Sequence, residues 1–414
     1  MEISKKLFIN IYSLILSIVV FFNYIFGVQL PIIIISTFYL FVITKMLFKK
    51  INIYIYELII ILYPTVILLA LINSSDIESS VKYFIGITCI SISCILISKN
   101  IVIFNEILNL FMIFSSIHVM FTLIYAVFPK FVMSINKIIL SSADYQKNYY
   151  EMTNNHINCG ITPVQSLNAV YISIFIGLVL SKIFTNSNKK KEHYILLVLG
   201  IISLLLTTKR GVTLAVAIAL IYTCYYYKYK INNKKFNLIR IIKNIFIIIF
   251  MILLIVILID KYFPGALLIF KRFTQKDIST GRIENYKIIW SYFSDNPILG
   301  NGLYFSRIIL DGNDAHNIYI QLLVETGLLG FLMFSVMIGY ILCIMVSMKR
   351  KNIKEKEYIY IFAVYFFIVF LVYGLTGNPL FDYSILIPFY IAISIILNIF
   401  RRKDYNESRN INLS

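Results

Sequence analysis

The sequence predicts an all-α, polytopic integral membrane protein, and three observations indicate this fold class. Hydrophobic residues make up 59% of the 414-residue chain and charged residues only 14%, and the mean hydropathy is +0.83. Apolar runs of about 18 residues or more recur along the chain, and each is long enough to cross a bilayer as a helix. Lysine and arginine gather in the short connections between these runs.

At ~20 residues per span, about twelve helices are expected in a single membrane domain over residues 1–414. The long connection at 261–315 is expected to form an extracytoplasmic loop subdomain that carries short amphipathic helices. The expected helices span 7–26, 30–48, 53–72, 81–98, 101–128, 161–185, 193–207, 211–227, 238–260, 316–346, 357–375 and 380–400.

The basic clusters set the expected orientation, because cytoplasmic loops carry an excess of Lys and Arg. With the N-terminus in the cytoplasm, every such cluster at a cytoplasmic connection falls inside. Both termini are then cytoplasmic, and the loops 129–160 and 261–315 lie outside. The net charge of +18 is therefore a topology signal. Nucleic-acid binding is set aside, because no zinc-finger spacing, RNA-binding signature or basic helix accompanies the charge.

Lys209 and Arg210 depart from this bias, because their hairpin faces the outside in the predicted topology. They also lie at the N-terminal end of a helix, where the dipole disfavours a cation. A compensating anion near Arg210 would explain both features. For Lys209 we favour contact with the lipid interface, where its side chain can reach a headgroup phosphate.

The loop segment "TGRIENYKIIWSYFSDNPILGNGLYF" divides into a helix and a turn. Apolar residues recur at helical spacing over 281–293, which predicts a short amphipathic helix at the membrane surface with Trp290 at headgroup level. Arg282 lies in its first turn. Gly300 and Gly302 then predict a tight turn, since no dinucleotide-binding unit follows this lone Gly-x-Gly.

After the turn, Asp314 is a reasonable N-cap for a helix that begins near His316. The helix dipole there favours a neutral imidazole, which can accept a proton from a hydroxyl group. Gly327 and Gly330 on the same helix allow close helix packing. Glu325 lies ~13 Å below His316 at 1.5 Å per residue, and we expect it to pair with a basic or polar neighbour.

These residues together resemble the outer-loop signature of the O-antigen polymerase and ligase superfamily. The signature is His316–Asn317, nine residues, then Gly327-x-x-Gly330. The order of segments also matches: "TTKRG" at an outer hairpin, then "GRIENYKIIW" and "NPILGNG", then the His-Asn helix. The resemblance covers about residues 200–335. It departs from the family at Lys209, where a small residue is usual.

The resemblance implies an enzyme of the bacterial cytoplasmic membrane that needs no cofactor. It would transfer an oligosaccharide from undecaprenyl diphosphate to an acceptor hydroxyl at the outer face. Arg210 and Arg282 are expected to bind the diphosphate bidentately, so that no metal is required. His316 would orient or deprotonate the acceptor, with inversion at the anomeric carbon. Additional substrate contacts are expected from Lys209, Arg272, Arg307, Asn317 and Tyr319.

Two acceptors fit the signature. A polymerase would use a second lipid-linked repeat unit of O-antigen or capsule, and a ligase would use a lipid A core or another acceptor. We favour the polymerase because such proteins are numerous and diverse. A flippase is the alternative from another class, but the predicted spans hold few charges and the basic residues gather at one face. The expected partners are the lipid bilayer, lipid-linked donor and acceptor glycans, a chain-length regulator and a flippase.

Overall fold

The computed structural model describes residues 2–26, 54–99, 101–154, 157–185, 190–231, 281–348, 353 and 357–411. Within these ranges the regular structure is helical, with no strand. Six of the described helices are long and apolar enough to cross a membrane, and shorter apolar helices accompany them. The predicted polytopic all-α fold is confirmed. The helices expected at 30–48 and 238–260 fall outside the described residues.

The chain divides into two compact units. The first comprises residues 1–107, 279–354 and 370–414, and the second comprises 108–278 and 355–369. Helices of the first unit are α1 (Glu2–Phe26), α3 (Ile55–Ala70), α4 (Ile77–Ile97), α13 (Arg282–Ser291), α14 (Phe305–Ile309), α15 (Ile318–Ser347) and α18 (Tyr383–Ile411). Helices of the second unit are α6 (Pro129–Ile139), α7 (Ser142–Thr153), α8 (Gln165–Thr185), α9 (Lys190–Leu206), α10 (Arg210–Tyr225) and the π-helix η2 (Tyr226–Ile231). Two helices, α5 (Ile101–Val127) and α17 (Glu357–Tyr373), run from one unit into the other.

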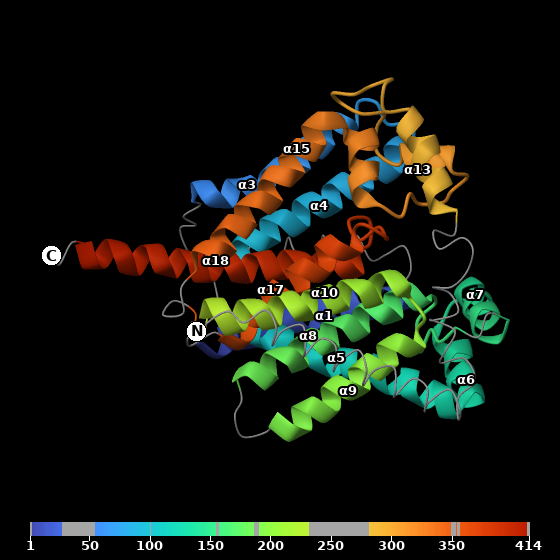
Figure 1. The fold of residues 1–414 in the computed structure, drawn as a ribbon, viewed down its shortest axis with the longest axis horizontal. Coiled ribbons are helices and arrows are strands. Elements are labelled where there is room, and N and C mark those ends of the chain that lie inside the picture. Colours follow the sequence, from blue (N-terminus) through green and yellow to red (C-terminus); the bar gives the residue numbers. More distant parts are fainter. Residues whose placement is uncertain are drawn as a thin grey trace. The chain divides into compact units, whose positions relative to one another are not determined.

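In the first unit α15 packs along α3, and α3 in turn contacts α4 (Figure 1). The rings of Tyr63 on α3 and Phe334 on α15 lie 5.3 Å apart. Gly330 keeps the two helices close, since a Cβ there would approach Val66 of α3 to 3.0 Å. This is the close packing that the sequence predicts for a small residue in a membrane helix.

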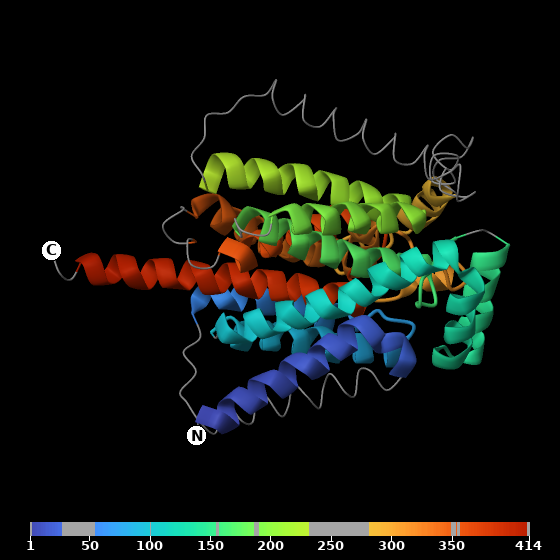
Figure 2. The ribbon, with the colours of Figure 1, turned by 90° about the horizontal axis from the view of Figure 1, so that it is seen from below.

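Helix α18 runs beside α4 and α1 (Figure 2), and buried polar groups join it to α4. The hydroxyl of Ser394 donates to the carbonyl of Cys94 at 3.0 Å, and the amide of Asn398 donates to the carbonyl of Ser98. Near this end of α4, Lys99 forms an ion pair with the buried Glu57 at 3.4 Å. Lys99 therefore neutralises the charge of Glu57, which lies inside a predicted span.

The second unit is built around α8, whose side chains are mostly buried and which packs against α9 and α10. A side chain at Gly177 of α8 would collide with the ring of Tyr365. The hydroxyl groups of Tyr226 and Tyr360 lie 2.9 Å apart in the interior. Aromatic side chains thus fill the space between these helices.

The connection between α5 and α8 is held by buried asparagines. Asn136 of α6 donates to Oδ1 of Asn148 on α7 at 3.0 Å and to the carbonyl of Gly160 at 2.9 Å. Asn148 donates to the carbonyl of Thr162 at 2.7 Å. Because these amides satisfy backbone groups that water cannot reach, they fix α6 and α7 to the rest of the connection.

Candidate active site

The turn at 297–302 binds to a break in α15. Gly327 interrupts the helix with φ 65° and ψ −171°. The N–H groups of Asn301 and Gly302 donate to the carbonyls of Val324 and Glu325, at 2.9 and 3.0 Å. In return, the N–H of Leu328 donates to the carbonyl of Pro297 at 2.8 Å. Helix carbonyls and amides freed by the break are thus satisfied by the turn.

Glycine is required on both sides of this contact. Gly300 and Gly302 have φ of 78° and 94°, which confirms the tight turn predicted for them. A Cβ at Gly300 would collide with the backbone of Glu325, and one at Gly327 would collide with the carbonyl of Ile298. Gly327 therefore serves a close backbone approach by the turn, whereas the sequence predicted helix packing for it.

Glu325 is fully buried beneath the turn. Its Oε1 accepts hydrogen bonds from Nε2 of Gln321 at 2.9 Å and from the N–H of Ser306 at 3.2 Å. The expectation that this acid pairs with a polar neighbour is confirmed. Its partners tie α14 to α15, so Glu325 fixes the loop that leads toward His316.

The start of α15 differs from the prediction. The helix begins at Ile318, and its N-cap is Asn317, whose Oδ1 accepts from the N–H groups of Tyr319 and Ile320 at 3.0 and 3.3 Å. The prediction that Asp314 caps this helix is wrong. Asp314 instead forms an ion pair with Arg307, with 2.6 Å between its Oδ1 and Nε. Because Asp314 binds the guanidinium of Arg307, its carboxylate does not cap α15. Asn317 supplies the acceptor for the N–H groups of the first turn.

His316 precedes the cap in a left-handed conformation with φ 56°. Such a conformation costs on the order of 1–3 kcal/mol in a non-glycine residue and persists only where the surroundings impose it. Two hydrogen bonds hold the backbone here. The hydroxyl of Tyr286 donates to the carbonyl of His316 at 3.2 Å, and the N–H of Ile318 donates to the carbonyl of Gly374 at 2.9 Å. The backbone that presents this imidazole is therefore fixed by α13 and by the connection that follows α17.

Arg282 occupies the first position of α13, after Gly281 with φ 79°. Its Nη1 donates to the carbonyl of Thr376 at 3.1 Å. One turn later on the same helix, Tyr286 contacts the backbone of His316 as described above. The guanidinium of Arg282 and the backbone at His316 are thus held by one helix and one connection, both within the first unit.

The residues of the connection at 374–382 were not predicted as part of the site. Besides the carbonyls of Gly374 and Thr376, the end of α17 contributes the carbonyl of Leu371, which accepts from the hydroxyl of Tyr319 at 2.7 Å. The sequence indicated only an interruption of the apolar pattern at this place. Backbone carbonyls leave no trace in the side-chain pattern, so nothing in the sequence marked these acceptors.

Arg307 is engaged within the loop. In addition to its ion pair with Asp314, its guanidinium lies over the ring of Tyr304 at 5.0 Å. Burial alone would lower the pKa of Arg307, but the hydrogen bond and charge of Asp314 outweigh that effect and raise the pKa. Burial raises the pKa of Tyr304 to about 12. These contacts favour a role for Arg307 in organising the loop, beside its predicted contact with substrate.

Helix α13 buries part of its apolar face within the loop, unlike a helix that lies only on a surface. Ile289 is fully buried, and Phe293 packs with it against Ala315 and Val324. The neighbouring Trp290 is 51% exposed. Part of the expected apolar face therefore packs against the loop core. Exposed residues such as Trp290 would make the predicted contact of α13 with the membrane surface.

Lys209 and Arg210 belong to the second unit and begin α10, as predicted. Lys209 is the N-cap residue and its side chain makes no capping hydrogen bond. Thr208 before it has φ 56°, and its hydroxyl lies 3.3 Å from Oε1 of Gln165 on α8. Both basic residues are half-buried. The tight turn therefore holds Arg210 at a helix start. Arg272, another predicted contact, lies outside the described residues.

Residues 195–335 match a family model described as O-antigen ligase. This matched segment covers about a third of the chain. It contains Arg210, Arg282, His316 and the two glycines of the signature, so the resemblance to the O-antigen polymerase and ligase superfamily is confirmed. The O-antigen ligase match supports an enzyme and a multi-pass membrane protein, and it gives no support to a flippase. No curated protein matches the chain.

Proposed function

We propose that this chain is a polymerase of O-antigen or capsule at the outer face of the bacterial cytoplasmic membrane. It would join repeat units carried on undecaprenyl diphosphate, without a metal ion. The observation that carries the proposal is the shared support of Arg282 and His316. Helix α13 and the connection at 374–382 hold a permanent cation and the backbone that carries an imidazole, which suits a phosphate leaving group and a hydroxyl nucleophile.

The chemistry follows from these two groups. The acceptor hydroxyl oxygen bonds to the anomeric carbon of the donor as the bond from that carbon to the diphosphate oxygen breaks. His316 orients the hydroxyl or takes its proton. Arg282 stabilises the negative charge that develops on the departing diphosphate. Attack opposite the leaving group inverts the anomeric configuration.

Arg210 is proposed to bind the same diphosphate. Guanidinium groups present a planar fork of donors that matches phosphate geometry and remain protonated at any physiological pH. The position of Arg210 at the start of α10 supports this role, since helix N-termini also favour anions. An anion bound there would remove the penalty that the helix dipole imposes on the cation.

A ligase is the second candidate, and the matched family model carries that description. The two activities share the donor and differ in the acceptor. In a polymerase the acceptor is another lipid-linked repeat unit, whereas in a ligase it is a lipid A core or a different molecule. A chain-length regulator and a flippase would be partners of the polymerase.

The test is a reconstituted reaction with one lipid-linked substrate. Repeat units on undecaprenyl diphosphate are extracted from cells that lack this chain and are mixed with the purified full chain in liposomes containing a chelator. A polymerase builds a ladder of products without further acceptor. A single product that forms only when a lipid A core is added would identify a ligase, and no transfer in either reaction would overturn the enzyme assignment.

A further inference from the structure

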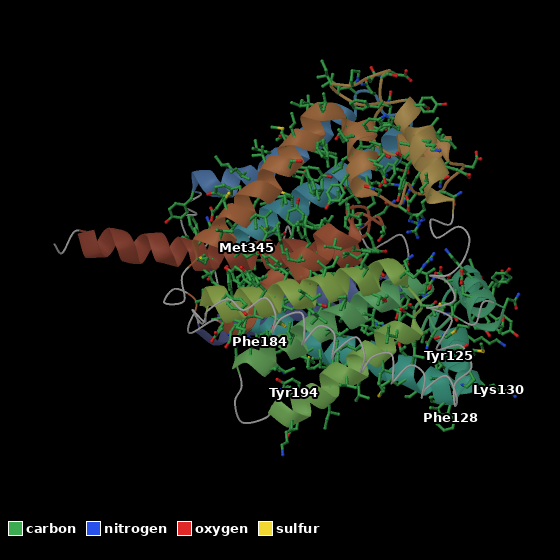
Figure 3. The ribbon with its side chains drawn as sticks, viewed as in Figure 1. Tyr125, Phe128, Lys130, Phe184, Tyr194 and Met345 are labelled. Carbon is green, nitrogen blue, oxygen red and sulfur yellow. The ribbon has the colours of Figure 1, made fainter. Side chains whose placement is uncertain are left out.

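Helix α6 starts where a membrane-spanning helix ends. The span α5 ends at Val127, Phe128 is the N-cap of α6, and Pro129 occupies the first turn. Figure 3 shows Tyr125 near the end of α5 and Phe128 and Lys130 at the start of α6. Because one residue separates the two helices, the headgroup layer that α5 must reach is within a few ångströms of α6.

One face of α6 is apolar and uncovered. Phe128, Phe131 and Ile138 are 63%, 54% and 83% exposed. At about 3.6 residues per turn, Phe131 and Ile138 lie seven residues apart on the same face. An isoleucine exposed to this degree is unfavourable in water, because its burial would remove apolar surface from contact with water.

The opposite face is fixed inward and cannot exchange with it. Val132 and Asn136 are fully buried, and the hydrogen bonds of Asn136 to Asn148 and Gly160 hold the helix in this rotation. The apolar face is therefore a stable surface of the second unit.

The charges of α6 complete the pattern. Lys130 and Lys137 are both exposed, and they also lie seven residues apart, on one side of the apolar face. The sequence of α6 contains no acidic residue. Lysines beside an apolar stripe suit a helix that lies in the interface plane, with its apolar face among acyl chains and its amines at the phosphate level.

We propose that α6 lies in the outer leaflet as an in-plane helix, where Lys130 and Lys137 bind anionic phospholipid headgroups. The occupant of the apolar face is the bilayer because the surface is continuous with a membrane span and carries complementary charge. The alternative occupant of this face is a protein partner, and the experiment distinguishes a protein from the bilayer.

The first measurement places a fluorescent probe on the helix. The chain has a single tryptophan, so Trp290→Phe provides an otherwise dark background. Phe131→Trp is introduced into the full chain, which is reconstituted in vesicles of phospholipid brominated on the acyl chain. We expect quenching at least about two-fold stronger than for Gln146→Trp on the exposed polar side of α7. Equal quenching at the two positions would overturn the proposal, and Ile138→Trp decides the matter if Phe131→Trp does not fold.

The second measurement tests the lysines. The melting temperature of the full chain is compared in zwitterionic vesicles and in vesicles containing phosphatidylglycerol. We expect anionic lipid to raise it in the native chain, and the Lys130→Gln, Lys137→Gln double variant to lose most of that rise. Lys147→Gln on α7 should keep it. An unchanged response of the double variant would exclude headgroup binding by these residues.

Discussion

The guanidinium of Arg282 donates a hydrogen bond to the carbonyl oxygen of Thr376, 3.1 Å away and 94 residues later in the chain. This bond uses one of the five N–H donors of the side chain and fixes the orientation of the planar group. Within the described ranges its other donors make no hydrogen bond, which leaves them for a phosphate in the proposed mechanism. The same connection accepts the N–H of Ile318, so the cation and the start of α15 are positioned by one piece of backbone.

Arg282→Lys should therefore lose most of the activity, although the charge remains. A lysine amine cannot hold Thr376 and bind two phosphate oxygens in a fixed plane. We expect a fall in polymer formation of about 100-fold, as for the loss of a key transition-state donor. The measurement is the polymer ladder at matched protein levels. Lys287→Ala, an exposed position of α13, is the control, and an Arg282→Lys chain as active as this control would refute the role.

Arg210 and its neighbour Lys209 allow the effects of two adjacent basic residues to be compared. We expect Arg210→Lys to fail nearly as badly as Arg210→Ala, because binding of the diphosphate depends on geometry as well as charge. Lys209→Ala should be much milder if Lys209 contacts lipid headgroups. The activity of all three variants is measured from polymer ladders in cells that contain the lipid-linked donor. If Arg210→Lys were fully active, or Lys209→Ala the more damaging change, the assignment of Arg210 would be wrong.

The helices could be predicted from hydropathy because a bilayer requires long apolar segments, and the bounds of α8, α10 and α15 agree closely with the expected ranges. The positions of Arg282 and His316 at helix starts also followed from local patterns. The N-cap of α15 did not follow from the local pattern, because Asp314 and Asn317 are both favourable N-cap residues. The choice depends on Arg307, whose approach to Asp314 is a tertiary contact. The contribution of Thr376 could not be predicted either, since any residue supplies a carbonyl.

Gly327 and Gly339 provide a matched pair on α15. Gly327→Ala should destabilise the protein by more than about 1 kcal/mol, because φ is positive there and the new methyl group meets the carbonyl of Ile298. Gly339 has open space around its Cα, so Gly339→Ala should be neutral or stabilising by up to ~1 kcal/mol. Thermal unfolding in detergent compares them. Equal melting temperatures for the two variants would mean that the turn at 297–302 does not depend on the break in α15.

Asp382 makes stability depend on pH. Burial raises the pKa of this carboxyl above its ordinary value of 3.8, and the charge of Asp314 adds to the effect. Because the folded chain holds the proton more tightly, the associated stability is complete below the ordinary pKa and is lost as pH rises through the folded-state pKa. Asp382→Asn should flatten the dependence of the melting temperature on pH upward from about pH 4. The exposed Asp295→Asn is the control, and an unaltered slope for Asp382→Asn would contradict the prediction.

The role of His316 is tested most directly in liposomes that contain the purified chain and lipid-linked repeat units. His316→Ala should reduce the rate of glycan transfer by about 100-fold to 10,000-fold, the range for loss of a general base. The variant should still bind the donor, because Arg210 and Arg282 are unchanged, and binding can be followed with a fluorescent donor analogue. Normal donor binding with this large fall in the transfer rate is the predicted result. Transfer at the native rate without this imidazole would contradict the proposed mechanism.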